Sequence, residues 1–102
     1  MERRLAAILA ADMYGYSRLM EADEDGVISR QKAHRRELID PEIERNRGHI
    51  VKTTGDGLLV EFASASNAVR SAIDIQTGMM QREGDRSEDE RIRYAKQQHF
   101  AC

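Results

Sequence analysis

The chain has 102 residues and a formal net charge of −2, from Lys+Arg 16 and Asp+Glu 18, so no overall field attracts nucleic acid or a membrane surface. The single cysteine, Cys102, excludes an intrachain disulfide, and no apolar run approaches the roughly 20 residues that a membrane-spanning helix needs. We therefore expect one small cytoplasmic domain with a single hydrophobic core, bound to neither nucleic acid nor membranes.

The first predicted element is a strand over residues 5–11, LAAILAA. The run is continuously apolar and too short for a buried helix, which is typical of a central strand covered on both faces. Asp12 follows directly, and Gly15 and Ser17 then predict a tight turn into a short helix. Ser17 is the expected N-cap of that helix, which covers residues 18–22.

A longer helix is predicted from residue 24 to about residue 47. Its apolar positions recur near the helical period: Val27, Ile28, His34, Leu38, Ile39 and Ile43. Pro41 is expected to kink or divide this helix, because proline lacks the amide hydrogen and crowds the preceding turn. Gly48 is expected to end it as the C′ residue.

A β-hairpin is predicted next. Residues 49–53 and 58–62 favour strands, and Thr54-Gly55-Asp56-Gly57 joins them. The Asp-Gly pair suits the positive φ angles of tight hairpin turns, which places Asp56 at the hairpin tip.

The last predicted helix starts at Ser64 or Ser66 and ends near Gly84. Its expected buried face consists of Ala65, Ala68, Val69, Ala72, Ile73, Gln76, Met79 and Met80. A polar loop follows over residues 85–91. Residues 92–95 could begin another strand, whereas residues 96–102 follow neither period and are expected to form a frayed tail.

This order of elements predicts the fold class. A strand, two helices, a hairpin, a helix and a strand stub suit an α+β sandwich in which helices cover one face of an antiparallel sheet. In such a fold the end of the first strand and the hairpin tip reach the same rim of the sheet. Asp12 and Asp56 could therefore share two oxygen-ligated Mg²⁺ ions, although each aspartate alone also suits a plain turn.

Three motifs together resemble bacterial class III adenylate/guanylate cyclase catalytic domains. They are RRLAAILAAD at 3–12, D-x-x-G-Y-S at 12–17 and KTTGDGLLVEF at 52–62, with AHRRELIDP at 33–41 between the last two. The resemblance runs from about residue 2 to residue 93 and covers the N-terminal portion of such a domain only. It implies a truncated ferredoxin-like sandwich over residues 1–93, followed by a divergent C-terminal tail over residues 94–102.

The resemblance also implies roles for particular residues. Asp12 and Asp56 would bind two Mg²⁺ or Mn²⁺ ions, with the backbone carbonyl of Met13 as a further ligand. Lys52 would select the purine base bound at the partner's metals in a head-to-tail homodimer. The residues expected to contact the substrate triphosphate are Tyr14, Gly15, Tyr16, Ser17 and Gly55.

The implied reaction converts ATP into a 3′,5′-cyclic nucleotide and pyrophosphate. GTP is the alternative substrate, although Lys52 favours ATP. The family's second purine-selecting residue, and an asparagine and an arginine that act on the ribose and the transition state, come later than residue 93. No residue of this chain matches them, so we expect little or no cyclase activity from these residues alone. The alternatives are a non-catalytic dimerisation or nucleotide-binding module, or an inert truncated copy.

Calcium binding is a further alternative for the acidic run at residues 21–26, which is similar to the start of an EF-hand loop. The twelfth position of that loop is Lys32 instead of a bidentate glutamate. The run is therefore interpreted as an acidic helix entrance. His34 and His49 are expected to pack or cap, and no Walker-type phosphate loop occurs in the sequence.

Overall fold

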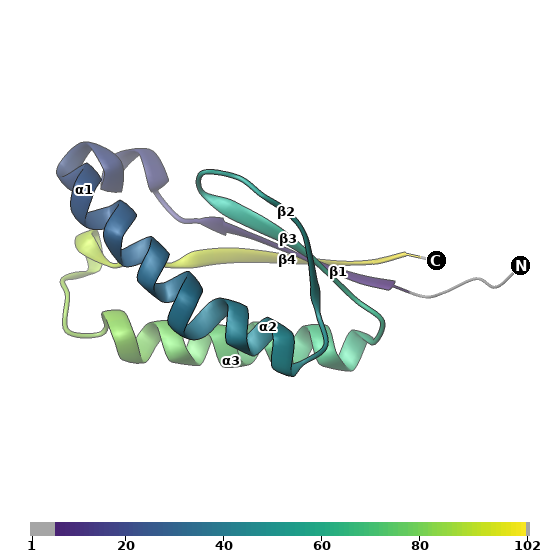
Figure 1. Ribbon diagram of the computed structural model, residues 1–102. Coiled ribbons are helices and arrows are strands. Elements are labelled where there is room, and N and C mark those ends of the chain that lie inside the picture. The colour runs from purple at the N-terminus through teal and green to yellow at the C-terminus, as the bar shows by residue number, and fades with distance from the viewer. Residues whose placement is uncertain (1–5, 102) are drawn as a thin grey trace, which may run out of the picture.

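The computed structural model describes residues 6–101, and side chains within residues 7–94. Four antiparallel strands form one sheet in the order β2-β3-β1-β4, and the helices cover one face of it (Figure 1). This is the ferredoxin-like α+β arrangement that the sequence predicted. Among the described residues, no helix is long and apolar enough to cross a membrane. The elements are β1 (Ala6–Met13), α1 (Tyr16–His34), a π-helical turn (Arg35–Ile39), α2 (Asp40–Arg45), β2 (His49–Thr53), β3 (Gly57–Phe62), α3 (Ala65–Glu83), a 3₁₀ turn (Glu88–Glu90) and β4 (Tyr94–Ala101).

Strand β1 lies between β3 and β4, as expected of a central strand, but helices cover only one of its faces within the described chain. Ala7, Leu9 and Met13 are buried, whereas Ile8 and Ala10 are only half-buried. The prediction of cover on both faces was wrong. It was drawn from a run in which every residue is apolar. An unbroken apolar run hides the alternation by which a strand with one covered face is normally recognised.

Helix α1 begins one residue before the predicted cap. Tyr16 is its first residue, and the cap position belongs to Gly15 at φ 63, so Ser17 lies inside the helix. The predicted division between two helices occurs at Asp23, which has non-helical angles of φ −161 and ψ 78. The Asp23 carboxylate accepts a hydrogen bond from the Gly26 amide at 3.1 Å, so the acidic run does start the second half of α1.

The end of α2 differs from the prediction by one residue. Pro41 lies in the first turn of α2, directly after the π-helical turn, which confirms the expected break. Arg47, not Gly48, has the left-handed conformation (φ 60) and occupies C′. The amides of Arg47 and Gly48 donate to the carbonyls of Glu44 and Ile43 respectively, which is the Schellman pattern. Gly48 is required for packing, since a Cβ there would lie 2.5 Å from the Phe62 ring.

The hairpin of β2 and β3 is confirmed, with an irregularity at Val51 between the paired positions Ile50 and Lys52. Its turn contains no residue with positive φ, so the stated reason for an Asp-Gly turn was wrong. The turn is closed by a hydrogen bond from the Thr54 amide to the Gly57 carbonyl at 2.8 Å.

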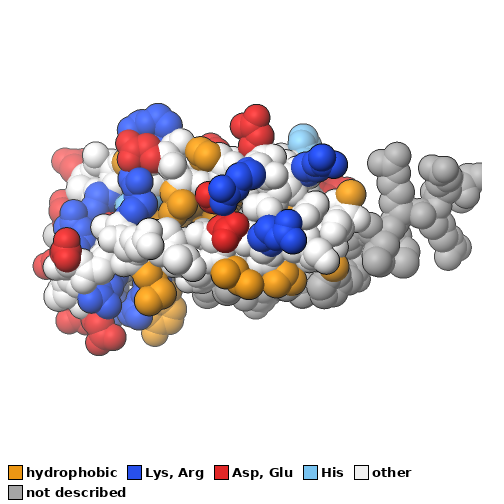
Figure 2. Space-filling model, turned by 90° about the horizontal axis from the view of Figure 1, so that it is seen from below, with side chains coloured by type: hydrophobic (Ala, Val, Ile, Leu, Met, Phe, Trp, Pro, Cys, Tyr) orange, Lys and Arg blue, Asp and Glu red, His pale blue; other side chains and the backbone are white. Residues whose placement is uncertain are grey.

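Helix α3 starts at the predicted cap, because the Ser64 hydroxyl accepts from the Asn67 amide at 3.3 Å. Only part of its predicted buried face is buried. Ala68, Ala72 and Met79 face the core, whereas the exposed fractions of Val69, Ile73 and Met80 are 39%, 54% and 75%. Figure 2 shows hydrophobic side chains exposed among charged ones on the side of the molecule where α3 lies.

Strand β4 corrects the prediction of a frayed tail. Residues from Tyr94 to Ala101 pair with β1 along its whole length, from Met13↔Tyr94 to Ala6↔Ala101. The stub and the tail are therefore one edge strand of the sheet. Its sequence has no clear period, and pairing with β1 supplies the order that the local pattern does not indicate.

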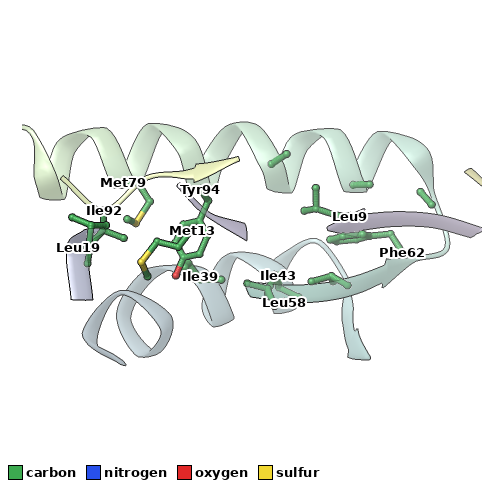
Figure 3. Packing of buried hydrophobic residues seen from close by; sticks show 14 of the residues in the cluster. Leu9, Met13, Leu19, Ile39, Ile43, Leu58, Phe62, Met79, Ile92 and Tyr94 are labelled. Atoms are coloured by element: carbon green, nitrogen blue, oxygen red, sulfur yellow. The ribbon is translucent and has the colours of Figure 1, made fainter. Parts of the chain in front are cut away.

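The core lies between the helices and the covered face of the sheet. Figure 3 shows Leu9 and Phe62 packed together, and Met13 close to Tyr94 and Ile39. Met13, at the end of β1, and Tyr94, at the start of β4, both belong to this core, so the loops that follow β1 and precede β4 start from packed residues.

Candidate functional site

The end of β1 and the tip of the β2–β3 hairpin meet at one rim of the sheet. Asp12 is in register with Gly57, the residue after Asp56. The Met13 amide donates to the backbone carbonyl of Asp56 at 2.6 Å. The two aspartates are thus brought together by main-chain pairing, as the sequence predicted.

Gly57 allows this close approach. A Cβ at this position would lie 2.5 Å from both the Ala11 carbonyl oxygen and Oδ1 of Asp12. Any other residue would therefore displace either β1 or the Asp12 carboxylate. The glycine brings the Asp12 carboxylate directly against the backbone that carries Asp56.

The two carboxylates have the character of a divalent-cation site. Asp12 is exposed and Asp56 is half-buried, and Oδ1 of Asp56 accepts from the Thr54 hydroxyl at 3.2 Å. Within the described residues, no group of three His, Cys, Asp or Glu side chains forms a closed metal site. Two carboxylates with open positions suit Mg²⁺, which is commonly held by one or two carboxylates together with water and substrate phosphates.

The start of α1 lies next to these aspartates and can accept an anion. Gly15 provides no side-chain cap, and the first helical hydrogen bond at this end runs from the Leu19 amide to the Gly15 carbonyl. The amides of the first turn, including that of Ser17, therefore have no acceptor within the helix and lie at the positive end of the helix dipole. The Arg18 guanidinium adds positive charge, because it lies 3.3 Å from where a Gly15 Cβ would be.

Both tyrosines of the turn are held in place. The Tyr14 side chain is 59% exposed, and the Arg93 guanidinium lies over its ring, 5.6 Å from the centroid. The Tyr16 hydroxyl lies against Gly55, at 3.4 Å from the position of a Cβ there. Of the residues predicted to contact a triphosphate, Tyr16 and Gly55 therefore lie close together beside Asp56, and the others follow Asp12 closely along the chain at the start of α1.

Lys52 is the one predicted site residue that the fold does not bring to the aspartates. It is exposed on edge strand β2, opposite Leu59, with β3 between it and β1. Its predicted role toward a partner's substrate stays a prediction.

Two further residues at the site were not predicted. The Gln31 side-chain amide donates to the Gly55 carbonyl at 2.8 Å. The Arg93 guanidinium stacks on the Tyr14 ring, and nothing in the sequence apart from its charge indicates this contact. A glutamine on a helix surface is ordinary, so only its neighbour in space reveals it.

No protein-family model matches the chain. A Rhizobium meliloti protein assigned as adenylate cyclase 3 is 48% identical over 92 residues, which are 90% of this chain and 16% of that protein. The crystal structure of an adenylate/guanylate cyclase/hydrolase from Silicibacter pomeroyi is 57% identical with a TM-score of 0.87, over 98% of this chain and 58% of that one. The chain belongs to the adenylate/guanylate cyclase family.

More distant cyclases share the fold. A Trypanosoma brucei adenylate cyclase structure has a TM-score of 0.80 at 18% identity, over 94% of this chain and 56% of that one. A bacterial light-regulated adenylyl cyclase has a TM-score of 0.77, also at 18% identity, over 96% of this chain and 54% of that one. The chain thus spans a little over half of each of these three structures.

Proposed function

We propose that Asp12 and Asp56, with the Met13 carbonyl, hold two Mg²⁺ or Mn²⁺ ions in the active site of an adenylate cyclase that produces a cyclic nucleotide signal. The observation that carries the proposal is the contact of β1 with the hairpin tip. There the Met13 amide donates to the Asp56 carbonyl, and the Asp12 carboxylate lies directly against Gly57. The bound ions would lower the pKa of the attacking hydroxyl and neutralise charge on the phosphoryl oxygens.

The residues of the β1–α1 turn bind and orient the triphosphate of ATP. The first-turn amides of α1 and Arg18 provide hydrogen-bond donors and positive charge for phosphate oxygens. Holding the triphosphate in this way presents the α-phosphorus to the ribose 3′-oxygen of the same nucleotide. A bond forms between these atoms, and the bond from the α-phosphorus to the oxygen that bridges it to the β-phosphate breaks. Pyrophosphate leaves with that oxygen, and the proton of the 3′-hydroxyl passes to water.

Lys52 belongs to the base-binding part of the proposed site. Its place on the outer strand of the sheet, away from Asp12 and Asp56, suits a residue that reaches a nucleotide held by a second copy. A head-to-tail homodimer would pair each Lys52 with the partner's aspartates. Lysine favours adenine over guanine by the family resemblance.

The 102-residue chain is proposed to bind metal–ATP without efficient turnover. The chain spans 58% of the Silicibacter structure. By the family resemblance, the asparagine and the arginine that act on the ribose and the transition state come later than residue 93 and have no counterpart among these residues. Loss of one electrostatic stabiliser typically costs about 10²–10³ in rate. We propose that the sequence of residues 94–102 is divergent, but residues 94–101 form β4 of the same sheet, so the cyclase-related domain includes them. We place the protein in the cytoplasm.

Calorimetric titration of the full chain with Mn²⁺–ATP tests the proposal. We expect saturable binding that D12N and D56N each weaken at least about tenfold, because each removes a charged oxygen ligand. D85N, which removes an exposed carboxylate far along the chain, is the matched control and should bind as the wild type does. Equal binding by all four proteins would show that the aspartate pair is not the metal site.

A cyclic AMP assay with Mn²⁺–ATP addresses turnover. We expect at most a slow rate from the 102 residues, and a rate comparable to that of a complete cyclase domain would refute that part of the proposal. Binding without turnover is also what a nucleotide-binding module would give, and an inert copy would show no binding at all. The aspartate variants separate a cyclase-type metal site from binding elsewhere.

A further inference from the structure

Asp56 is held through both of the peptide groups that flank it. The carbonyl of the Asp56–Gly57 peptide accepts from the Met13 amide at 2.6 Å. The carbonyl of the Gly55–Asp56 peptide accepts from Nε2 of Gln31 at 2.8 Å. Because each peptide group is planar, fixing the two carbonyl directions fixes the Cα–Cβ direction of Asp56 between them.

The two restraints come from different parts of the molecule. Met13 belongs to β1, the strand that carries Asp12, whereas Gln31 belongs to the last turn of α1. Met13 therefore ties Asp56 to the other aspartate, and Gln31 ties it to the helix whose first turn faces the proposed phosphate position. Without Gln31, the hairpin tip would have no side-chain link to α1 among the hydrogen bonds of the described residues.

Gln31 is itself restrained. It is half-buried on α1, so the packing around it already limits the conformations of its side chain. A partly buried side chain has less conformational entropy to lose than an exposed one when it binds the hairpin tip. Such support from outside the ligands is what keeps a metal-binding carboxylate in a productive orientation.

We infer that Gln31 is a positioning residue for Asp56, acting through the Gly55–Asp56 peptide group and not by contact with metal or nucleotide. The role of Gln31 in catalysis rests on the proposed function, whereas its effect on the orientation of Asp56 does not depend on it. Gln31 would thus set how well the hairpin carboxylate faces the one on β1.

The test compares Q31M with Q76M in the full chain. Methionine has a similar length and shape but no hydrogen-bond donor, so Q31M removes the bond to Gly55. Gln76 donates in the same way to a backbone carbonyl, that of Tyr94, at 2.8 Å, so Q76M removes an equivalent bond away from the hairpin tip. Q31K is the rescue variant, since its ammonium group can again donate to the Gly55 carbonyl.

The first measurement is hydrogen exchange of the Met13 amide, which reports its bond to Asp56 whether or not metal binds. We expect about three- to tenfold faster exchange in Q31M, the range that one hydrogen bond supports, with wild-type exchange in Q76M and recovery in Q31K. Unchanged exchange in Q31M, or equal acceleration in Q76M, would overturn the inference.

The second measurement is Mn²⁺–ATP affinity by calorimetry. Q31M should bind about three- to tenfold more weakly than the wild type, and Q76M should not. If the wild type binds and Q31M binds equally well, the positioning role is refuted even though the proposed function stands. If the wild type does not bind, the proposed function fails, and exchange at Met13 still decides whether Gln31 orients Asp56.

Discussion

Acid should destabilise this protein through His34, a buried histidine that connects α1 to α3. Its Nδ1 accepts a hydrogen bond from Nε of Arg82 at 2.8 Å. The ring hydrogen must then be on Nε2, which donates to the Glu83 carboxylate at 2.9 Å. A second proton would place N–H against N–H at Arg82, so the folded state holds the ring neutral.

The charges around the ring support this state. The pKa of His34 is lowered from its usual value of 6.5, mainly by burial. Arg82 and Arg30 lower it further, while Glu83 on the facing helix acts in the opposite direction. Glu37 and Arg86 complete the network, through ion pairs with Arg82 and Glu83 respectively.

The sign of the effect follows from the lowered pKa. The unfolded chain takes up a proton near pH 6.5 and the folded chain only at lower pH, so the stability from His34 is complete above pH 6.5 and is lost as pH falls below it. If the folded ring stays neutral at pH 5.5, the free energy of unfolding falls by about 1.4 kcal/mol between pH 7.5 and 5.5. That is a substantial fraction of the ~5–15 kcal/mol typical of a domain.

Urea denaturation at pH 7.5, 6.5 and 5.5 measures this loss. H34Q is the informative variant, because glutamine can accept from Arg82 and donate to Glu83 but does not titrate. We expect a flat profile from H34Q and a wild-type profile from H49Q, which removes an exposed histidine. The same slope in wild type and H34Q would refute the assignment of the acid sensitivity to His34.

Three further substitutions should change stability by predictable amounts in the same assay. E83A should cost about 3–5 kcal/mol, because it leaves Arg30 and the Ile92 amide without the buried carboxylate that pairs with them, and a loss under 1 kcal/mol would contradict this. G48A should cost about 1–3 kcal/mol, since its Cβ would lie 2.5 Å from Phe62, and wild-type stability would mean that the ring moves freely. S64A should cost about 1 kcal/mol by removing the cap of α3. S66A, which changes a serine that does not cap the helix, is the control.

The closeness of Asp12 and Asp56 could be predicted from sequence because both steps are local. An apolar run defines β1, and two β-favouring runs around a glycine-rich turn define the hairpin. Once these elements belong to one sheet, the end of the strand and the tip of the hairpin share a rim. The positive φ expected for the turn was unnecessary to that conclusion, which is why its error did no harm.

Other features depended on partners that no local pattern reveals. Residues 96–101 have no strand-like period, yet they form β4 because β1 offers an unpaired edge along its whole length. The apolar face of α3 is wider in sequence than the part that the sheet covers, so Val69 and Ile73 remain exposed. In both cases the neighbouring element, not the segment's own composition, decided the outcome.

By itself, then, the sequence determined the strands and helices other than β4, where most of them begin, and which two carboxylates end at the same rim. These properties follow from hydrophobic period, caps and turns, all of which act over a few residues. The tertiary structure alone decided that Gln31 holds the hairpin tip and that His34 is locked between Arg82 and Glu83. Those bonds join residues 24 to 49 positions apart, and their energies exist only after the helices have packed on the sheet.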